Sequence, residues 1–204
     1  MAAIAFGCLY FFIRQYFKDG IWRFDLPLVN KSLGTAALFL ITLSMLTTGI
    51  SYFSRRTRPS LALRKYYGLA GFWTGLIHGA VTHLALPAVG LHPERKGVTA
   101  HSDAPGLAAL ILFGLMAVLS NSRAVKRMGG NAWRKTLRYG GYAGLILAGA
   151  HAVILKGASW RKYFRTFDSV LPSLSLPVAA LAAAAIILRL AVWVSQTRGI
   201  RKRK

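Results

Sequence analysis

The chain has 204 residues, 54% of them hydrophobic, and its 27 Lys and Arg against 5 Asp and Glu give a formal net charge of +22. The apolar residues are grouped in long uncharged runs, which excludes an ordinary soluble domain. These runs are also too long and too rich in Ala and Leu for barrel strands. The single cysteine, Cys8, excludes a disulfide within the chain, and the sequence contains no CxxC, zinc-ligand spacing or phosphate-binding loop. These features predict an all-α integral membrane protein, with a single transmembrane domain over 1–204.

Six candidate membrane spans follow in chain order. The first, 1–17, is short and reaches span length only if Arg14 extends to the membrane surface, so whether it crosses stays open. It does not resemble a cleaved signal peptide, because no basic residue precedes its apolar core. The other five are nearly uncharged and approach the roughly 20 residues that a helix needs to cross a bilayer: 33–53, 68–89, 105–120, 139–156 and 174–194. The sequence therefore predicts a transmembrane bundle of six helices, or at least five.

The basic residues are distributed unevenly between the predicted loops. Sixteen of them and no acidic residue lie in 54–66, 121–138 and 198–204, whereas the alternate loops carry ten together with all five acidic residues. By the positive-inside rule the first group is cytoplasmic, which predicts a multi-pass protein of a cell inner membrane with a cytoplasmic C-terminus. Topology and contact with anionic membrane lipid account for the charge, so no nucleic-acid partner is expected.

Two of the spans share one spacing around a histidine. "GFWTGLIH" (71–78) and "GLILAGAH" (144–151) each read Gly, three residues, a small residue, two residues, His. His78 lies eleven residues from the cytoplasmic end of its span and His151 twelve, roughly 16 and 18 Å at 1.5 Å per residue. On a helix, the small residues fall on the same face as the histidine, one and two turns before it: Gly71, Gly75, Gly144 and Ala148.

Two imidazoles at equal depth on different helices are able to ligate one haem iron from opposite sides, and the small residues leave room for the macrocycle. This pattern predicts one haem b with His78 and His151 as axial ligands. The competing interpretation is that small-xxx-small spacing packs membrane helices together and that each histidine hydrogen-bonds to a neighbouring helix. His83, five residues after His78, is turned about 140° away from it. It is expected at the outer interface, with contact to a haem propionate as the alternative.

Several other basic residues have simpler explanations. Arg189, near the inner end of the last span, is expected to extend to the cytoplasm, with a role at a cofactor as the alternative. The mixture of aromatic and basic residues over 160–167 predicts a helix lying on the membrane surface. Five basic side chains of the second cytoplasmic loop could hold the phosphate of a flavin mononucleotide, although topology already requires them there: Arg123, Lys126, Arg127, Arg134 and Lys135.

A family resemblance comes from two stretches, "LRKYYGLAGFWTGLIH" and "NSRAVKRMGGNAWRKTLRYGGYAGLILAGAH". They resemble the ferric-reductase-like transmembrane domain family, and within it the haem-binding membrane subunits of periplasmic methionine sulfoxide reductase systems. The likeness covers about residues 33–190. It implies a six-helix bundle in which histidines of the third and fifth spans hold b haem, and His78 and His151 match those positions.

The chain also departs from the family pattern. Members with two haems carry a second histidine about thirteen residues nearer the cytoplasm, and here those positions hold Arg138 and Lys65. Both side chains are cations at neutral pH and cannot ligate iron. The sequence therefore predicts one haem rather than two.

The expected function is that of an electron-transfer subunit of an oxidoreductase system rather than a self-contained enzyme. Electrons would pass from quinol or a cytoplasmic flavoprotein towards a redox partner on the outer side, with flavin mononucleotide or quinone as further cofactors. The loops are too short to contain a flavin–nicotinamide reductase domain. The alternative is a non-catalytic accessory or assembly subunit of a larger membrane complex, with or without a bound haem or other pigment.

Overall fold

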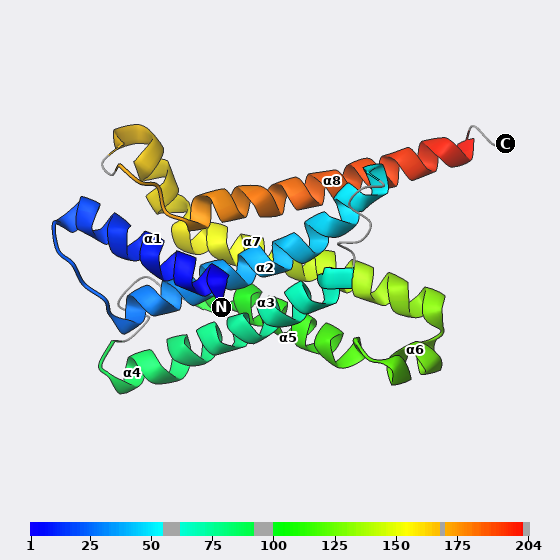
Figure 1. The fold of residues 1–204 in the computed structure, drawn as a ribbon, viewed down its shortest axis with the longest axis horizontal. Coiled ribbons are helices and arrows are strands. Elements are labelled where there is room, and N and C mark those ends of the chain that lie inside the picture. Colours follow the sequence, from blue (N-terminus) through cyan, green and yellow to red (C-terminus); the bar gives the residue numbers. More distant parts are fainter. Residues whose placement is uncertain (55–61, 92–99, 168–169, 202–204) are drawn as a thin grey trace.

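The computed structural model of the chain is all-helical over the residues that it describes, which are 1–54, 62–91, 100–167 and 170–201. Figure 1 shows long helices lying side by side, joined by short connections. In chain order they are α1 (Ala2–Asp19), α2 (Leu26–Phe53), α3 (Arg64–Ala80), the π-helix η2 (Val81–Ala85), α4 (Leu86–Ala88), α5 (Ala100–Leu119), α6 (Ser122–Met128), α7 (Gly130–Thr166) and α8 (Ser175–Arg201).

Four of these segments are long and apolar enough to cross a membrane: Leu26–Phe53, Arg64–Ala88, Gly130–Thr166 and Ser175–Thr197. A fifth is added if Asp103–Leu119 and Ser122–Met128, which meet at 88°, form one broken span. The prediction of a multi-pass, all-α membrane protein is thus confirmed in its coarser form, with four to five candidate spans. The predicted sixth span, 1–17, does form helix α1, but α1 does not meet the same criterion of length and composition.

Helix α2 lies at the centre of the bundle, in contact with α1, α3, α7 and α8 (Figure 1). It begins at Leu26, seven residues before the predicted start, because the Asp25 side chain accepts a hydrogen bond of 2.9 Å from the backbone N–H of Leu28 and Pro27 occupies the first turn. Two buried hydroxyls near its start bond to the helix backbone: Ser32 Oγ donates a bond of 3.0 Å to the Leu28 carbonyl, and Thr35 Oγ1 donates one of 2.9 Å to the Lys31 carbonyl. The first turns of α2 are therefore well anchored, and they contribute to the site described below.

The main hydrophobic core is shared between four helices, α2, α5, α7 and α8. Leu145 of α7 is completely buried within it. Membrane helices associate through close packing rather than through exclusion of water, so small residues allow them to approach. The core cluster consists of Leu38, Ile41, Met45, Ala109, Phe113, Leu145, Val178, Ala182 and Ala185.

The connection from α5 to α7 is held by side chains. Asn121 caps α6 by accepting a hydrogen bond of 2.9 Å from the backbone N–H of Ala124. The indole nitrogen of Trp133, at the start of α7, donates a bond of 2.8 Å to the carbonyl of Leu119, the last residue of α5. Backbone groups at the bend are thus satisfied without a continuous helix.

Helix α7 extends beyond its predicted span at both ends. It has 37 residues, roughly 55 Å at 1.5 Å per residue, so it is longer than the hydrocarbon core of a bilayer. Residues 160–166 are helical, as predicted, and form the last turns of α7, which continues through Gly157 and ends where Phe167 adopts a φ of 45°. Parts of the predicted basic loop, residues 55–61, and the C-terminal residues 202–204 lie outside the described residues.

Candidate functional site

A cavity of about 800 Å³ lies between α1, α2, α3, α5 and α7, and both predicted ligands, His78 and His151, line it. The two imidazoles are near enough to interact electrostatically. Small-molecule and cofactor sites commonly have volumes of about 300–1,000 Å³ and mostly apolar walls. The structure therefore brings the two histidines, 73 positions apart in the chain, to one space of cofactor size.

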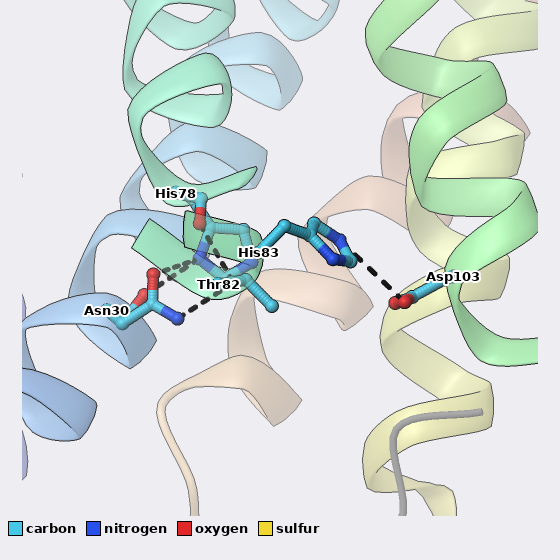
Figure 2. A network of polar contacts seen from close by, with 5 residues as sticks. All are labelled: Asn30, His78, Thr82, His83 and Asp103. Atoms are coloured by element: carbon cyan, nitrogen blue, oxygen red, sulfur yellow. Dashed lines mark hydrogen bonds and ion pairs between the residues drawn. The ribbon is translucent and has the colours of Figure 1, made fainter. Parts of the chain in front are cut away.

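His78 is held in a defined orientation by Asn30 of α2 (Figure 2). The ring nitrogen Nδ1 lies 2.8 Å from the Asn30 side-chain oxygen and 3.0 Å from the Asn30 carbonyl oxygen. Both partners are acceptors, so Nδ1 carries the proton and donates it. Nε2 is then the unprotonated nitrogen with a lone pair, and within the described residues no hydrogen bond engages it.

A second set of bonds holds Asn30 itself. Its amide nitrogen donates a bond of 2.9 Å to the Thr82 hydroxyl, and that hydroxyl donates one of 2.8 Å to the backbone carbonyl of His78 (Figure 2). The loop of bonds runs from the ring of His78 through Asn30 and Thr82 back to the backbone of His78. Such outer contacts set the tautomer and direction of a metal-binding histidine, and they increase its basicity.

Each histidine ring packs against a glycine of a neighbouring helix. A Cβ placed on Gly34 of α2 would lie 2.9 Å from Cε1 and 3.0 Å from Nε2 of His78. A Cβ on Gly106 of α5 would lie 2.8 Å from Nδ1 of His151. Contacts this short do not occur for real side chains, so both positions require glycine with the rings as they stand.

Two of the predicted small residues form cavity wall. A Cβ on Gly75 would find only Ala37 Cβ at 3.7 Å and Leu110 Cδ1 at 3.8 Å, which is ordinary contact, so space remains in front of this residue. Ala148 also lines the cavity and packs against the core cluster. These two positions agree with the predicted role of making room beside the histidines.

The other two predicted small residues serve mainly to pack helices. A Cβ on Gly71 would lie 2.6 Å from Ile41 Cγ1, so this glycine permits close approach of α3 to α2 at the edge of the cavity. Gly144 does not line the cavity, because its Cα faces the Phe113 ring, which a Cβ would meet at 2.8 Å. Here the competing interpretation of small-xxx-small spacing applies.

His83 was expected at the outer membrane interface, and in the structure it lines the same cavity as His78 and His151. Its Nε2 lies 3.7 Å from a carboxylate oxygen of Asp103 on α5, whereas His78 points towards Asn30 on α2 (Figure 2). The predicted angle between His83 and His78 assumed a regular α-helix, but Val81–Ala85 forms a π-helix with i→i+5 bonds. Single π-turns of this kind are frequent at functional sites.

The charge on the cavity wall is concentrated in the parts of α1, α2, α5 and α7 nearest the predicted outer loops. Three carboxylates occur there, those of Asp19, Asp25 and Asp103. They are outnumbered by cationic side chains, whereas the deeper wall is apolar, with residues such as Leu38, Phe72 and Phe113. The cavity therefore suits an amphipathic ligand with acidic groups at one end. The cations are Arg14, Lys18, Arg23, Lys31, Lys156 and Lys162.

Within the described parts of the chain, no group of three or more His, Cys, Asp or Glu side chains is arranged to hold a bare metal ion. A macrocyclic iron complex supplies four nitrogen ligands of its own and needs only the two axial ones from protein. The pair of histidines fits that requirement. The chain matches no protein-family model and no curated protein, so the family resemblance rests on its motifs alone.

Proposed function

We propose that the protein is a b-type haem-binding membrane subunit that passes electrons from quinol or a cytoplasmic flavoprotein towards an acceptor on the outer side. The observation that carries this proposal is the placement of His78 and His151 on one cavity of about 800 Å³, with Nδ1 of His78 already engaged by Asn30. The family resemblance of the two histidine-containing stretches supports the same function.

Each part of the cavity has a role in this proposal. His78 and His151 would supply the two axial nitrogens, and Asn30 would keep the His78 lone pair directed inward. Gly34 and Gly106 leave space for the rings, and Gly75 leaves space for the macrocycle. The cations at the outer end of the cavity would neutralise the acidic groups of the haem, and would therefore exclude the orientation in which these groups face the deeper apolar wall. When bound, the haem would supply a one-electron carrier.

The inner half of the membrane domain lacks a second pair of histidines, since Arg138 and Lys65 occupy those positions. We therefore propose one haem per chain, with quinone or a flavin mononucleotide as the neighbouring redox partner on the cytoplasmic side. The distribution of basic residues supports an inner-membrane location with the C-terminus in the cytoplasm. The chemistry of the final acceptor would belong to the outer-side partner.

The test is a pyridine haemochrome assay on purified protein, combined with reduced-minus-oxidised spectra of membranes. We expect about one haem b per chain, and loss of the low-spin spectrum in both His78→Ala and His151→Ala. His101→Ala is the matched control, because His101 lies on α5 but does not line the cavity. A haem ratio near two, or retention of the spectrum in both ligand variants, would contradict the proposal.

The alternative is an accessory or assembly subunit of a larger membrane complex. The close contacts of Gly71 and Gly144 favour it, because helix packing explains half of the small-residue spacing without any cofactor. Complete absence of a haem band from the parent protein, in membranes of cells that make haem, would favour this function over the first.

A further inference from the structure

A second polar site lies nearer the predicted cytoplasmic end of the bundle, centred on Tyr142 of α7. Its hydroxyl oxygen is buried and has no hydrogen-bond partner among the described residues. A buried hydroxyl without a partner is unfavourable and rare in proteins. Tyr142 lies nine residues before His151, roughly 13 Å nearer the predicted cytoplasmic end of α7. It is therefore separate from the cavity described above and does not line it.

Arginines from three helices lie near Tyr142. The guanidinium of Arg189 on α8 lies over the Tyr142 ring, 5.9 Å from its centroid. Arg64 of α3 and Arg138 of α7 also interact electrostatically with Tyr142, and both Arg138 and Arg189 interact with Arg64. All three arginines are half-buried rather than extended into solvent. Arg189 thus turns towards Tyr142, whereas extension to the cytoplasm was the prediction.

This cluster contains no acidic counter-charge in the part of the chain that the structure describes. The ion pairs found there are Lys18–Asp19 and His83–Asp103, both at the opposite end of the bundle. All five acidic residues of the sequence belong to the predicted outer loops. Like charges that converge in a partly buried place repel each other strongly unless an anion is present. The positive-inside rule explains why arginines occur on this side, but not why three half-buried ones gather near one buried hydroxyl.

We propose that Arg64, Arg138, Arg189 and the hydroxyl of Tyr142 bind a phosphate group. Guanidinium groups match phosphate oxygens with paired hydrogen bonds, and the Tyr142 hydroxyl has an unused donor. Two sources share this chemistry: the headgroup of an anionic phospholipid and a soluble phosphate. Tyr142 lies three residues, roughly 4–5 Å, inside the predicted inner boundary at Tyr139. Basic pockets between membrane helices near the cytoplasmic surface bind the headgroups of anionic lipids. The site stands independently of haem binding at the cavity.

The test uses the full-length protein in an uncharged detergent, with thermal unfolding as the measurement. Phosphatidylglycerol, phosphatidylcholine and inorganic phosphate are titrated separately, since a ligand that binds the folded state raises the Tm. We expect phosphatidylglycerol to raise the Tm and phosphatidylcholine to have little effect. A rise with inorganic phosphate alone, at matched concentration, would support the site and assign it to a soluble phosphate. If neither phosphatidylglycerol nor inorganic phosphate raises the Tm, the proposal is overturned.

Matched variants separate the site from general charge effects. Arg64→Gln/Arg138→Gln/Arg189→Gln should abolish the rise. Lys65→Gln/Arg161→Gln/Arg165→Gln removes the same charge from exposed side chains of α3 and α7 and should retain it. Equal loss in the two triple variants would overturn the proposal.

Single substitutions keep the test decisive if the first triple variant does not fold. Tyr142→Phe and Arg189→Lys should each weaken the apparent affinity for the stabilising anion about tenfold or more. Tyr142→Phe loses a hydroxyl donor, and Arg189→Lys loses the planar guanidinium that forms paired hydrogen bonds. Unchanged affinity in both single variants would also overturn the proposal.

Discussion

The imidazole of His78 lies so close to Gly34 that a Cβ on this glycine would be 2.9 Å from the ring. The same relationship occurs between His151 and Gly106, so each of the two histidines has a glycine of another helix behind it. Neither ring is able to move far towards that neighbour. Both are held at the wall of one cavity, which is the arrangement that a rigid two-sided ligand requires.

The first prediction concerns these glycines. Gly34→Ala and Gly106→Ala should displace the adjacent rings, destabilise the protein by about 1–3 kcal/mol and remove most of the haem spectrum. Gly149→Ala on α7 is the control, because a Cβ there meets nothing within 4 Å and should leave the spectrum intact. Reduced-minus-oxidised spectra and Tm values of the purified variants provide the measurement. Equal spectra in Gly34→Ala and Gly149→Ala would show that the His78 ring is not confined as described.

The second prediction concerns the orientation of His78. Asn30→Leu should lower haem affinity about 10- to 100-fold, because it removes the side-chain oxygen that accepts from Nδ1. Thr82→Val should have a smaller effect in the same direction, because it removes a partner of Asn30 rather than of the ring. Haem titration of the apoprotein measures both.

Thr74→Val is the matched control for Thr82→Val. Among the residues that the structure describes, Thr74 Oγ1 bonds only to the Ala70 carbonyl of its own helix. Its replacement should therefore leave haem affinity unchanged. An effect of Thr74→Val as large as that of Thr82→Val would point to general destabilisation instead of a positioning role.

The third prediction distinguishes the three histidines of the cavity. His78→Ala and His151→Ala should each abolish low-spin haem, whereas His83→Ala should leave the spectrum nearly intact, because His83 is directed to Asp103. Asp103→Asn, which removes the carboxylate charge, should also retain the spectrum. Spectra of membranes, normalised to the amount of protein, decide between the ligands. The assignment would be wrong if His83→Ala lost the haem and His78→Ala kept it.

The fourth prediction concerns topology. A reporter fused after Lys204 should be cytoplasmic, and one inserted near Gly97 should be external, because the basic residues concentrate in the loops of one side and all acidic residues in those of the other. Paired phosphatase and fluorescent reporters give opposite signals on the two sides and check each other. Reversed signals would invert the orientation of the cavity and of the arginine cluster.

The spans were largely predictable because long uncharged runs leave few alternatives to membrane helices. Their ends were less so. The start of α2 depends on one capping bond from Asp25, and α7 continues through Gly157, where a break is common but not required. The ends of helices depend on the chemistry of single residues, which the hydrophobic pattern of a sequence does not show.

The shared cavity of His78 and His151 was predictable from their equal depth, which needs only the rise per residue of a helix. The glycines behind them and Asn30 were not, because they lie on other helices and one sequence does not reveal how helices are rotated against each other. The face of His83 was also missed, since the π-turn at Val81–Ala85 changes the angle that regular helical geometry gives.

The central position of α2 has a consequence for the order of biosynthesis. Asn30, Gly34 and His78 all lie in the first three helices and are translated early, whereas Gly106 and His151 come from α5 and α7. The nascent chain therefore forms one wall of the cavity well before the other exists. A cofactor held by both histidines would have to be loaded after α7 has entered the bilayer, so cofactor loading would follow membrane insertion of the chain.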